Sequence, residues 1–162
     1  MIETLVEKHW PAVKVIYVAG MQTGHATFEQ PNQIASFASW QSGKLTGSTI
    51  VFVEGEKVLG WAALSPVSDR CVYAGVAEVS VYVAADVQGK GIGSQLLMEL
   101  IRISEAQGIW TLQAGIMTEN AASIRLHEKC GFRRIGVREK LGQLNGQWRD
   151  VMLLERRSLV VG

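Results

Sequence analysis

The feature of this sequence that most constrains its fold is a strand, a glycine-rich loop and a helix in direct succession. Across residues 77–83, valines alternate with Glu78 and other polar side chains, which is the period of two of a β-strand. Residues 88–94 read QGKGIGS and lead into apolar residues at helical spacing that end near Gly108. Unpaired N–H groups at such a helix start bind anions, and phosphate is the natural ligand. The unit therefore predicts an anion site between a strand and a helix.

Two better-known phosphate-binding motifs do not fit this loop. The P-loop pattern G-x-x-x-x-G-K-[ST] requires a hydroxyl residue after its lysine, but Lys90 is followed by Gly91. The dinucleotide pattern G-x-G-x-x-G requires a third glycine where Ser94 stands, and it follows the first strand of its unit rather than lying in mid-chain. The plainer alternative, that the glycines only make a tight turn, stays open on the loop alone.

The remaining segments predict further strands and helices in a single domain over residues 1–162, of the α/β (α+β) class. Pro11 suits the first turn of the first helix, and Gly20 suits the position just past its end. Asn145 and Gly146 predict a hairpin turn between the last two strands. Besides the unit above, strands are predicted at residues 2–6, 49–53, 58–64, 109–116, 132–139 and 148–155, and helices at residues 9–19, 32–41 and 120–130.

The charge balance and the cysteines exclude several classes of function. Lysine and arginine number 16 against 15 acidic residues, so no basic excess predicts nucleic acid or an anionic membrane as a partner. No apolar run reaches the roughly 18 residues of a membrane span, and no signal-peptide pattern is present, so we expect an unexported, soluble protein. Cys71 and Cys130 form no paired motif, which favours free thiols in the cytoplasm. His127 and Cys130 lie one helical turn apart, but without further ligands they predict no metal site.

A resemblance to a known family emerges from two segments taken together. Residues 88–93 fit the Q/R-x-x-G-x-G/A signature of the GCN5-related N-acetyltransferases (GNAT), and residues 120–132, NAASIRLHEKCGF, resemble the second cofactor-contacting segment of that family. Residues 65–66, 70, 73, 78–83, 126–128 and 146–150 are similar to the branch that acetylates phosphinothricin, methionine sulfoximine and methionine sulfone. The resemblance therefore covers nearly the whole chain.

The resemblance implies a mixed sheet, splayed open near its centre and flanked by helices, with acetyl-CoA held as a co-substrate between the two central strands. The central strand would meet the pantetheine, the glycine loop would meet the pyrophosphate, and Asn120 would lie near the thioester. Asn120 is equally suited to a helix N-cap and can fill both roles. A homodimer is also implied. The implied cofactor-binding residues are Val81, Tyr82, Val83, Gln88, Gly89, Lys90, Gly91, Ile92, Gly93, Ser94 and Asn120.

Acetyl transfer to an amine requires a base, a donor for the oxyanion and a departing thiol. Glu78 stands where the resembling branch has its proposed base, and the strand alternation turns it away from the valines. The alternative is an edge glutamate that faces solvent. A backbone N–H near Val81 is the candidate oxyanion donor. His127 stands where most of the family has a proton-donating tyrosine, so it is a candidate acid, with a structural histidine in the helix as the alternative.

For the acceptor, the branch implies a small amino-acid-like amine. Arg70 is a candidate for pairing with its carboxylate or phosphinate oxygen, and Phe28 and Tyr73 are candidates for the walls of its site. A solvated arginine and ordinary aromatic packing are the alternatives. Ala74 and Gly75 stand where relatives often carry larger residues, which predicts a site of a different shape. Two other functions stay open: N-terminal acetylation of peptides or proteins, and non-catalytic binding of an acyl-CoA.

Overall fold

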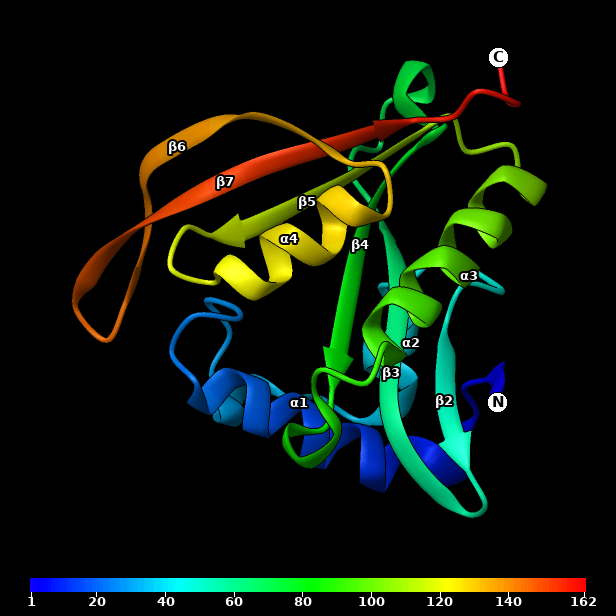
Figure 1. Ribbon diagram of the computed structural model, residues 1–162, viewed down its shortest axis with the longest axis vertical. Helices are drawn as coiled ribbons and strands as arrows, with labels where there is room; N and C mark the ends of the chain where they lie inside the picture. The colour runs from blue at the N-terminus through cyan, green and yellow to red at the C-terminus, as the bar shows by residue number, and fades with distance from the viewer.

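Seven strands form one sheet in the order β1-β2-β3-β4-β5-β7-β6, as the computed structural model of residues 1–162 shows (Figure 1). All neighbouring strands are antiparallel except β4 and β5, which run parallel at the centre of the sheet. The sheet is therefore mixed, as expected. The strands are β1 (Ile2–Thr4), β2 (Ile50–Glu54), β3 (Lys57–Pro66), β4 (Val76–Val83), β5 (Thr111–Met117), β6 (Arg133–Leu144) and β7 (Gln147–Arg157).

Helices cover both faces of the sheet. The apolar sides of α3 and α4 join the strands in the larger core on one face. On the other face, α1 packs against a second core that includes Tyr17 and Trp61, and α2 adds Phe37 and Trp40 at its margin. No helix has the length and apolar character needed to cross a membrane. The helices are α1 (Trp10–Gln22), α2 (Phe37–Ser42), α3 (Ile92–Ala106) and α4 (Ala121–Lys129), with short 3-10 turns at Glu7–His9, Pro31–Gln33, Cys71–Tyr73 and Ala85–Val87.

Strand β4 shows the alternation that its sequence predicts. Ala77 and Val79 are buried in the core beneath α3, whereas Tyr82 packs toward α1 on the opposite face. Because side chains alternate along a strand, Glu78 shares the face of Tyr82. We refer to this side of the sheet as the α1 face.

The sheet is splayed at its centre, between β4 and β5. Strand β4 pairs with β3 over residues 77–83, but it pairs with β5 only over residues 76–78. Beyond Glu78 the two parallel strands separate, so one edge of β4 has no neighbouring strand. The expected central opening is thus confirmed, and it begins at the residue proposed as the base.

Two predicted helix boundaries were wrong. The first helix does not stop before Gly20 but continues to Gln22. A Cβ atom at Gly20 would lie 2.6 Å from the ring of Tyr82, so this glycine permits close packing of the helix on β4 rather than ending the helix. The second helix begins at Phe37, after Ser36 caps it with a side-chain acceptor 3.2 Å from the Ser39 N–H.

Candidate functional site

The unpaired edge of β4 presents backbone groups to the central opening. The Ala84 N–H donates to the Leu59 carbonyl of β3 at 2.8 Å. The even-numbered residues of β4 are therefore those whose backbone groups bond to β3. Because alternate residues of a strand point their N–H and C=O groups to opposite sides, those of Val79, Val81 and Val83 face the opening. An extended amide chain can pair with such an edge as another strand would.

The glycine loop supplies a run of backbone donors at the start of α3. The N–H groups of residues 89–94 donate to no acceptor within the protein, and Gly91, the N-cap residue, offers no side chain to cap them. Gly89 and Gly91 have φ values of +81° and +82°, a backbone conformation that favours glycine. The loop thus concentrates partial positive charge at one helix end, and this fits a pyrophosphate.

The glycines of this loop have different roles. A Cβ atom on Gly89 or Gly91 would have no protein atom within 4 Å, so both positions border open space. A Cβ atom on Gly93 would instead lie 3.1 Å from a methyl group of Leu126. Gly93 therefore serves the contact between α3 and α4, in addition to presenting its N–H. The open positions are those expected where a ligand approaches the backbone closely.

Glu78 lies on the α1 face at the point where β4 and β5 part. Its neighbours in register are Ser65 on β3 and Gln113 on β5, so it occupies a central strand and not a sheet edge. The side chain is half-buried, and its Oε1 lies 3.7 Å from the position of a Cβ atom on Gly115. With a bare glycine beside it, the carboxylate has room for a small molecule on the β5 side.

His127 lies inside the protein, on α4. It is 4% exposed, its Nδ1 lies 2.7 Å from the Ser123 carbonyl, and its ring meets that of Phe132 edge-on at 5.2 Å. Burial lowers the pKa of this imidazole, and the bond to Ser123 only partly opposes that effect. A neutral imidazole with its proton on Nδ1 matches the surroundings. This geometry fits the alternative stated above, that His127 is a structural histidine of the helix.

Asn120 caps α4 and also holds a distant loop. Its Oδ1 accepts from the Ser123 N–H at 3.3 Å, and its Nδ2 donates to the His25 carbonyl at 3.5 Å. The N-cap role that its sequence position suggested is therefore present. The second contact ties α4 to the connection between α1 and α2, residues 23–36, which we call the α1–α2 connection.

Besides Asn120, the α1–α2 connection is held in place by Arg149 and Tyr17, which the sequence did not single out as site residues. Arg149 on β7 donates to the Gly24 carbonyl at 2.5 Å and to the Glu119 carboxylate at 3.0 Å. The phenol of Tyr17 donates to Glu29. Phe28 lies against β6, with its ring 3.1 Å from the position of a Cβ atom on Gly142. The only sequence signal was that Arg149 falls within the closing motif of residues 146–150.

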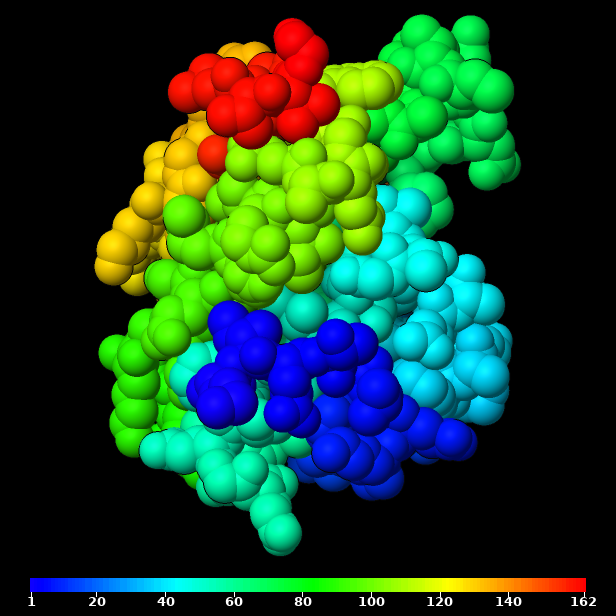
Figure 2. Space-filling view, turned by 90° about the vertical axis from the view of Figure 1, so that its right-hand side faces the viewer, coloured from blue at the N-terminus to red at the C-terminus, as the bar shows by residue number.

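Arg70 and Tyr73 lie together, away from the glycine loop. The Arg70 guanidinium is 5.6 Å from the centre of the Tyr73 ring, and both residues are exposed. They belong to the connection between β3 and β4, at the opposite end of β4 from the loop that leads into α3 (Figure 1). Figure 2 shows this connection projecting from the body of the molecule at the upper right. Neither residue forms a hydrogen bond or an ion pair with Glu78.

Lys44 is a further charged residue on the α1 face that the sequence did not indicate. Its Nζ donates to the Ser65 hydroxyl at 3.2 Å and lies 5.3 Å from the centre of the Trp40 ring. Burial lowers the pKa of the ammonium, while the negative charges of Glu29 and Glu78 raise it. Beyond this pair of carboxylates the face is aromatic, with Trp61 and Tyr82 stacked at 4.8 Å and 7°.

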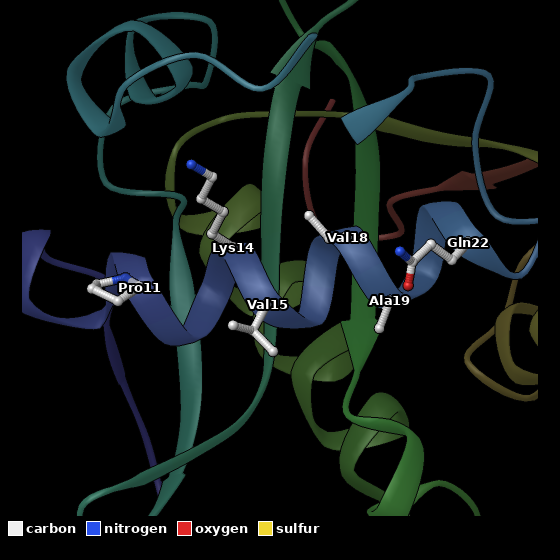
Figure 3. Close-up of a pocket in the computed structure, with 6 residues that line it drawn as sticks. All are labelled: Pro11, Lys14, Val15, Val18, Ala19 and Gln22. Carbon is white, nitrogen blue, oxygen red and sulfur yellow. The ribbon is translucent and has the colours of Figure 1, made fainter. Parts of the chain in front are cut away.

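A separate shallow groove of about 400 Å³ runs along the outer side of α1 (Figure 3). It contains none of the residues proposed for the site. Its lining residues are Pro11, Lys14, Val15, Val18, Ala19 and Gln22. A second hollow, of about 420 Å³, lies between α2 and the start of β2 and is bordered in part by Lys44.

Comparisons with known proteins show the family to which the whole chain is similar. The model of the acetyltransferase (GNAT) family matches residues 10–132. An L-methionine sulfoximine/L-methionine sulfone acetyltransferase of Pseudomonas paraeruginosa is 33% identical over 149 residues, which are 90% of this chain and 87% of that protein. A phosphinothricin N-acetyltransferase of Alcaligenes faecalis is 34% identical over 151 residues, or 90% and 76% of the two chains. The crystal structure of a GNAT phosphinothricin acetyltransferase from Sinorhizobium meliloti in complex with acetyl-CoA matches with a TM-score of 0.87 and 28% identity, covering 97% of this chain and 87% of that one.

Proposed function

Because this chain belongs to the acetyltransferase (GNAT) family, we propose that it transfers the acetyl group of acetyl-CoA to the amine of a small amino-acid-like compound. The acceptor would be of the phosphinothricin, methionine sulfoximine or methionine sulfone type, the substrates named for the relatives above. The observation that carries the proposal is that Glu78 lies where the free edge of β4 begins. A carboxylate thus borders the opening in which the thioester would lie.

The residues expected to hold acetyl-CoA form two groups. The N–H groups of residues 89–94 would bind the pyrophosphate, with Lys90 adding charge and Gln88 fixing the loop through a bond to the Val83 carbonyl at 3.4 Å. The free backbone groups of Val81 and the free N–H of Val83 would pair with the amides of the pantetheine. When bound there, acetyl-CoA supplies a thioester carbonyl that an amine can attack. Tyr82 would support this edge from the α1 face, where it stacks on Trp61.

In the reaction, Glu78 would attract the substrate ammonium and take its proton, directly or through water. The freed amine nitrogen would then form the C–N bond to the thioester carbon, while the Val81 N–H stabilises the developing oxyanion. Collapse of the tetrahedral intermediate breaks the C–S bond, and the second proton that the nitrogen loses as the amide forms passes to the thiolate, directly or through water. A neutral His127 is a poor proton donor, so its buried position supports a positioning role at α4 over the acid role. A thiolate leaves readily without a dedicated acid.

For the acceptor site we propose that Phe28 forms a wall, because the α1–α2 connection holds it near β6. Arg70 and Tyr73 stay candidates for binding an acidic group, and their exposure is compatible with a site completed by a second subunit.

We also propose a homodimer. Its interface would be formed by exposed apolar residues on edge strand β6 and adjacent β7, namely Ile135, Val137, Leu141 and Trp148. The two unpaired cysteines support the proposed cytoplasmic location.

An acetyl-CoA turnover assay tests this function by following release of the free thiol. We expect phosphinothricin, methionine sulfoximine or methionine sulfone to be acetylated with a kcat/KM well above that of a short peptide. Preference for the peptide would identify an N-terminal acetyltransferase. Tight binding of acetyl-CoA without turnover of any of these amines would identify a non-catalytic binding module.

A further inference from the structure

The α1 face carries one ammonium that has no counter-ion. Lys44 takes part in none of the ion pairs of the protein, although it is half-buried and its pKa is lowered by desolvation. Its Nζ has one hydrogen-bond partner, the hydroxyl of Ser65. An ammonium has three donors, so two are left for another molecule. A partly buried cation without an ion-pair partner is destabilising, which marks this position as one where an anion would bind favourably.

The surroundings hold Lys44 beside Glu78. The next residue, Leu45, donates its N–H to the Leu64 carbonyl of β3 at 2.8 Å, which fixes the backbone at this point. The side chain then reaches Ser65, and Ser65 is the register neighbour of Glu78 on the adjacent strand. Side chains opposite each other in an antiparallel pair lie on the same face. The Lys44 ammonium and the proposed base are therefore both neighbours of Ser65 on the α1 face.

The other carboxylate near Lys44 is already engaged. Glu29 reaches the α1 face from the α1–α2 connection, and it accepts a hydrogen bond from the phenol of Tyr17. Glu29 and Glu78 both act on the ammonium at longer range, without forming an ion pair with it. The groups that face Lys44 are thus two carboxylates, one hydroxyl and the Trp40 ring. None of them neutralises it by direct contact.

We infer that Lys44 binds the carboxylate of the amino-acid acceptor and so orients the neighbouring α-amine toward Glu78. This inference rests on the proposed function and specifies its substrate class. In an α-amino acid the amine and the carboxylate are bonded to the same carbon atom, which matches a cation and a base that are both neighbours of Ser65. The Ser65 hydroxyl, which accepts from Lys44, is free to donate its own proton to the same carboxylate.

Such a site selects free amino acids over their amides and over peptides. An amide or a peptide bond offers a neutral carbonyl to Lys44, so the ammonium would stay unneutralised in the complex. The exposed Gly115 lies on the other side of Glu78 and leaves space for the acceptor's side chain. Lys44 would thereby recognise the charge of the α-carboxylate, while the space at Gly115 would accommodate the acceptor's side chain.

The test compares methionine sulfone with its carboxamide, which lacks only the negative charge, in the full-length protein with saturating acetyl-CoA. In the wild type we expect kcat/KM for the acid to exceed that for the amide by at least about tenfold. The amide has the lower amine pKa and so the larger fraction of free amine, which means that amine ionisation cannot produce this preference. A wild type that uses both equally would overturn the inference with no variant needed.

Lys44→Met removes the charge while keeping the length of the side chain. We expect KM for the acid to rise by about 10- to 100-fold with little change in kcat, and kcat/KM for the amide to stay within about threefold of wild type. Lys44→Arg should restore most of the acid preference. The matched control is Lys14→Met, which removes an exposed lysine from the outer side of α1.

Two results for Lys44→Met would overturn the inference. One is a kcat/KM for the acid that stays at the wild-type value. The other is an equal loss for both substrates together with a displaced acidic limb of the pH profile, because that would mean that Lys44 only keeps Glu78 ionised. An acetyl-CoA affinity equal to that of wild type shows that the variant is folded. A wild type that acetylates neither compound, and neither phosphinothricin nor methionine sulfoximine, would refute the proposed function itself, and this is seen before any variant is made.

Discussion

At the scale of single residues, the glycines of the loop are needed for different reasons: Gly91 for its backbone conformation and Gly93 for close packing. Gly91 has a φ of +82° and open space where a Cβ atom would be, whereas Gly93 meets Leu126. Gly55, in the turn between β2 and β3, has the same kind of backbone, with a φ of +63° and no neighbour within 4 Å. It offers a matched position far from the proposed site.

We predict that Gly91→Ala weakens acetyl-CoA binding by about tenfold or more, because its methyl group occupies the space from which phosphate would approach the N–H groups. Both Gly91→Ala and Gly55→Ala should lower the free energy of unfolding by about 1 to 2 kcal/mol, the cost of a side chain at positive φ. Calorimetric titration and urea denaturation measure the two effects. Equal affinity in the two variants would mean that the loop is only a turn.

We predict that Glu78→Gln lowers kcat by roughly 10²- to 10⁴-fold, because the amide cannot take the amine proton. Acetyl-CoA affinity should be unchanged, and the acidic limb of the pH–rate profile should flatten. Glu99→Gln on the outer side of α3, where Glu99 pairs with Arg102, is the control. Near-normal turnover in Glu78→Gln would assign deprotonation to water or to another residue.

His127 leads to a prediction about stability and pH. Its pKa is lowered in the folded protein by burial, so the unfolded chain binds a proton that the folded chain does not. Stability is therefore full above the unfolded value of about 6.5 and falls as the pH drops below it, until the folded pKa is reached. In His127→Gln this part of the pH dependence should be lost. Urea denaturation at pH 5 and pH 7.5 provides the comparison, and an identical pH dependence in both proteins would contradict it.

At the scale of elements, the α1–α2 connection is fixed from several directions. Arg149 from β7 and Asn120 from α4 bind its backbone carbonyls at Gly24 and His25. The same segment delivers Phe28 and Glu29 to the α1 face. The ordering of the acceptor side of the site thus depends on side chains from the other half of the chain.

We predict that Arg149→Met loosens this connection and raises KM for the acceptor several-fold, while acetyl-CoA affinity stays unchanged. Loss of two bonds from a largely buried guanidinium should lower the free energy of unfolding by about 1 to 3 kcal/mol. Hydrogen exchange of residues 23–30 and steady-state kinetics measure both effects. Arg102→Met, which removes an exposed arginine, serves as the control, and equal exchange in the two variants would refute the role of Arg149.

At the scale of the whole molecule, strand β6 leaves one long edge of the sheet unpaired, with apolar side chains exposed along it. Ile135, Val137 and Leu141 are 43%, 47% and 42% exposed, and Trp148 on β7 is 57% exposed. Unpaired strand edges and exposed apolar residues are both features that a second copy of the chain can cover.

We predict that the protein is a homodimer and that Val137→Glu converts it to a monomer, since a buried carboxylate in the interface would lack a partner. Analytical ultracentrifugation of wild type and variant decides this. The comparison variant is Val15→Glu in the groove on the outer side of α1 (Figure 3). Dissociation by Val15→Glu and not by Val137→Glu would place the interface on α1.

The sequence by itself determined the features that depend on neighbours along the chain. The alternation in β4 set the side of Glu78, and the glycines before α3 set the row of free N–H groups, because both follow from local backbone geometry. The tertiary structure decided the rest. Lys44 contacts Ser65, and only the register of β3 on β4 places Ser65 beside Glu78, while Gly20 is explained only by the Tyr82 ring. Such contacts depend on how separate elements pack, and no local pattern encodes which side chains will then face each other.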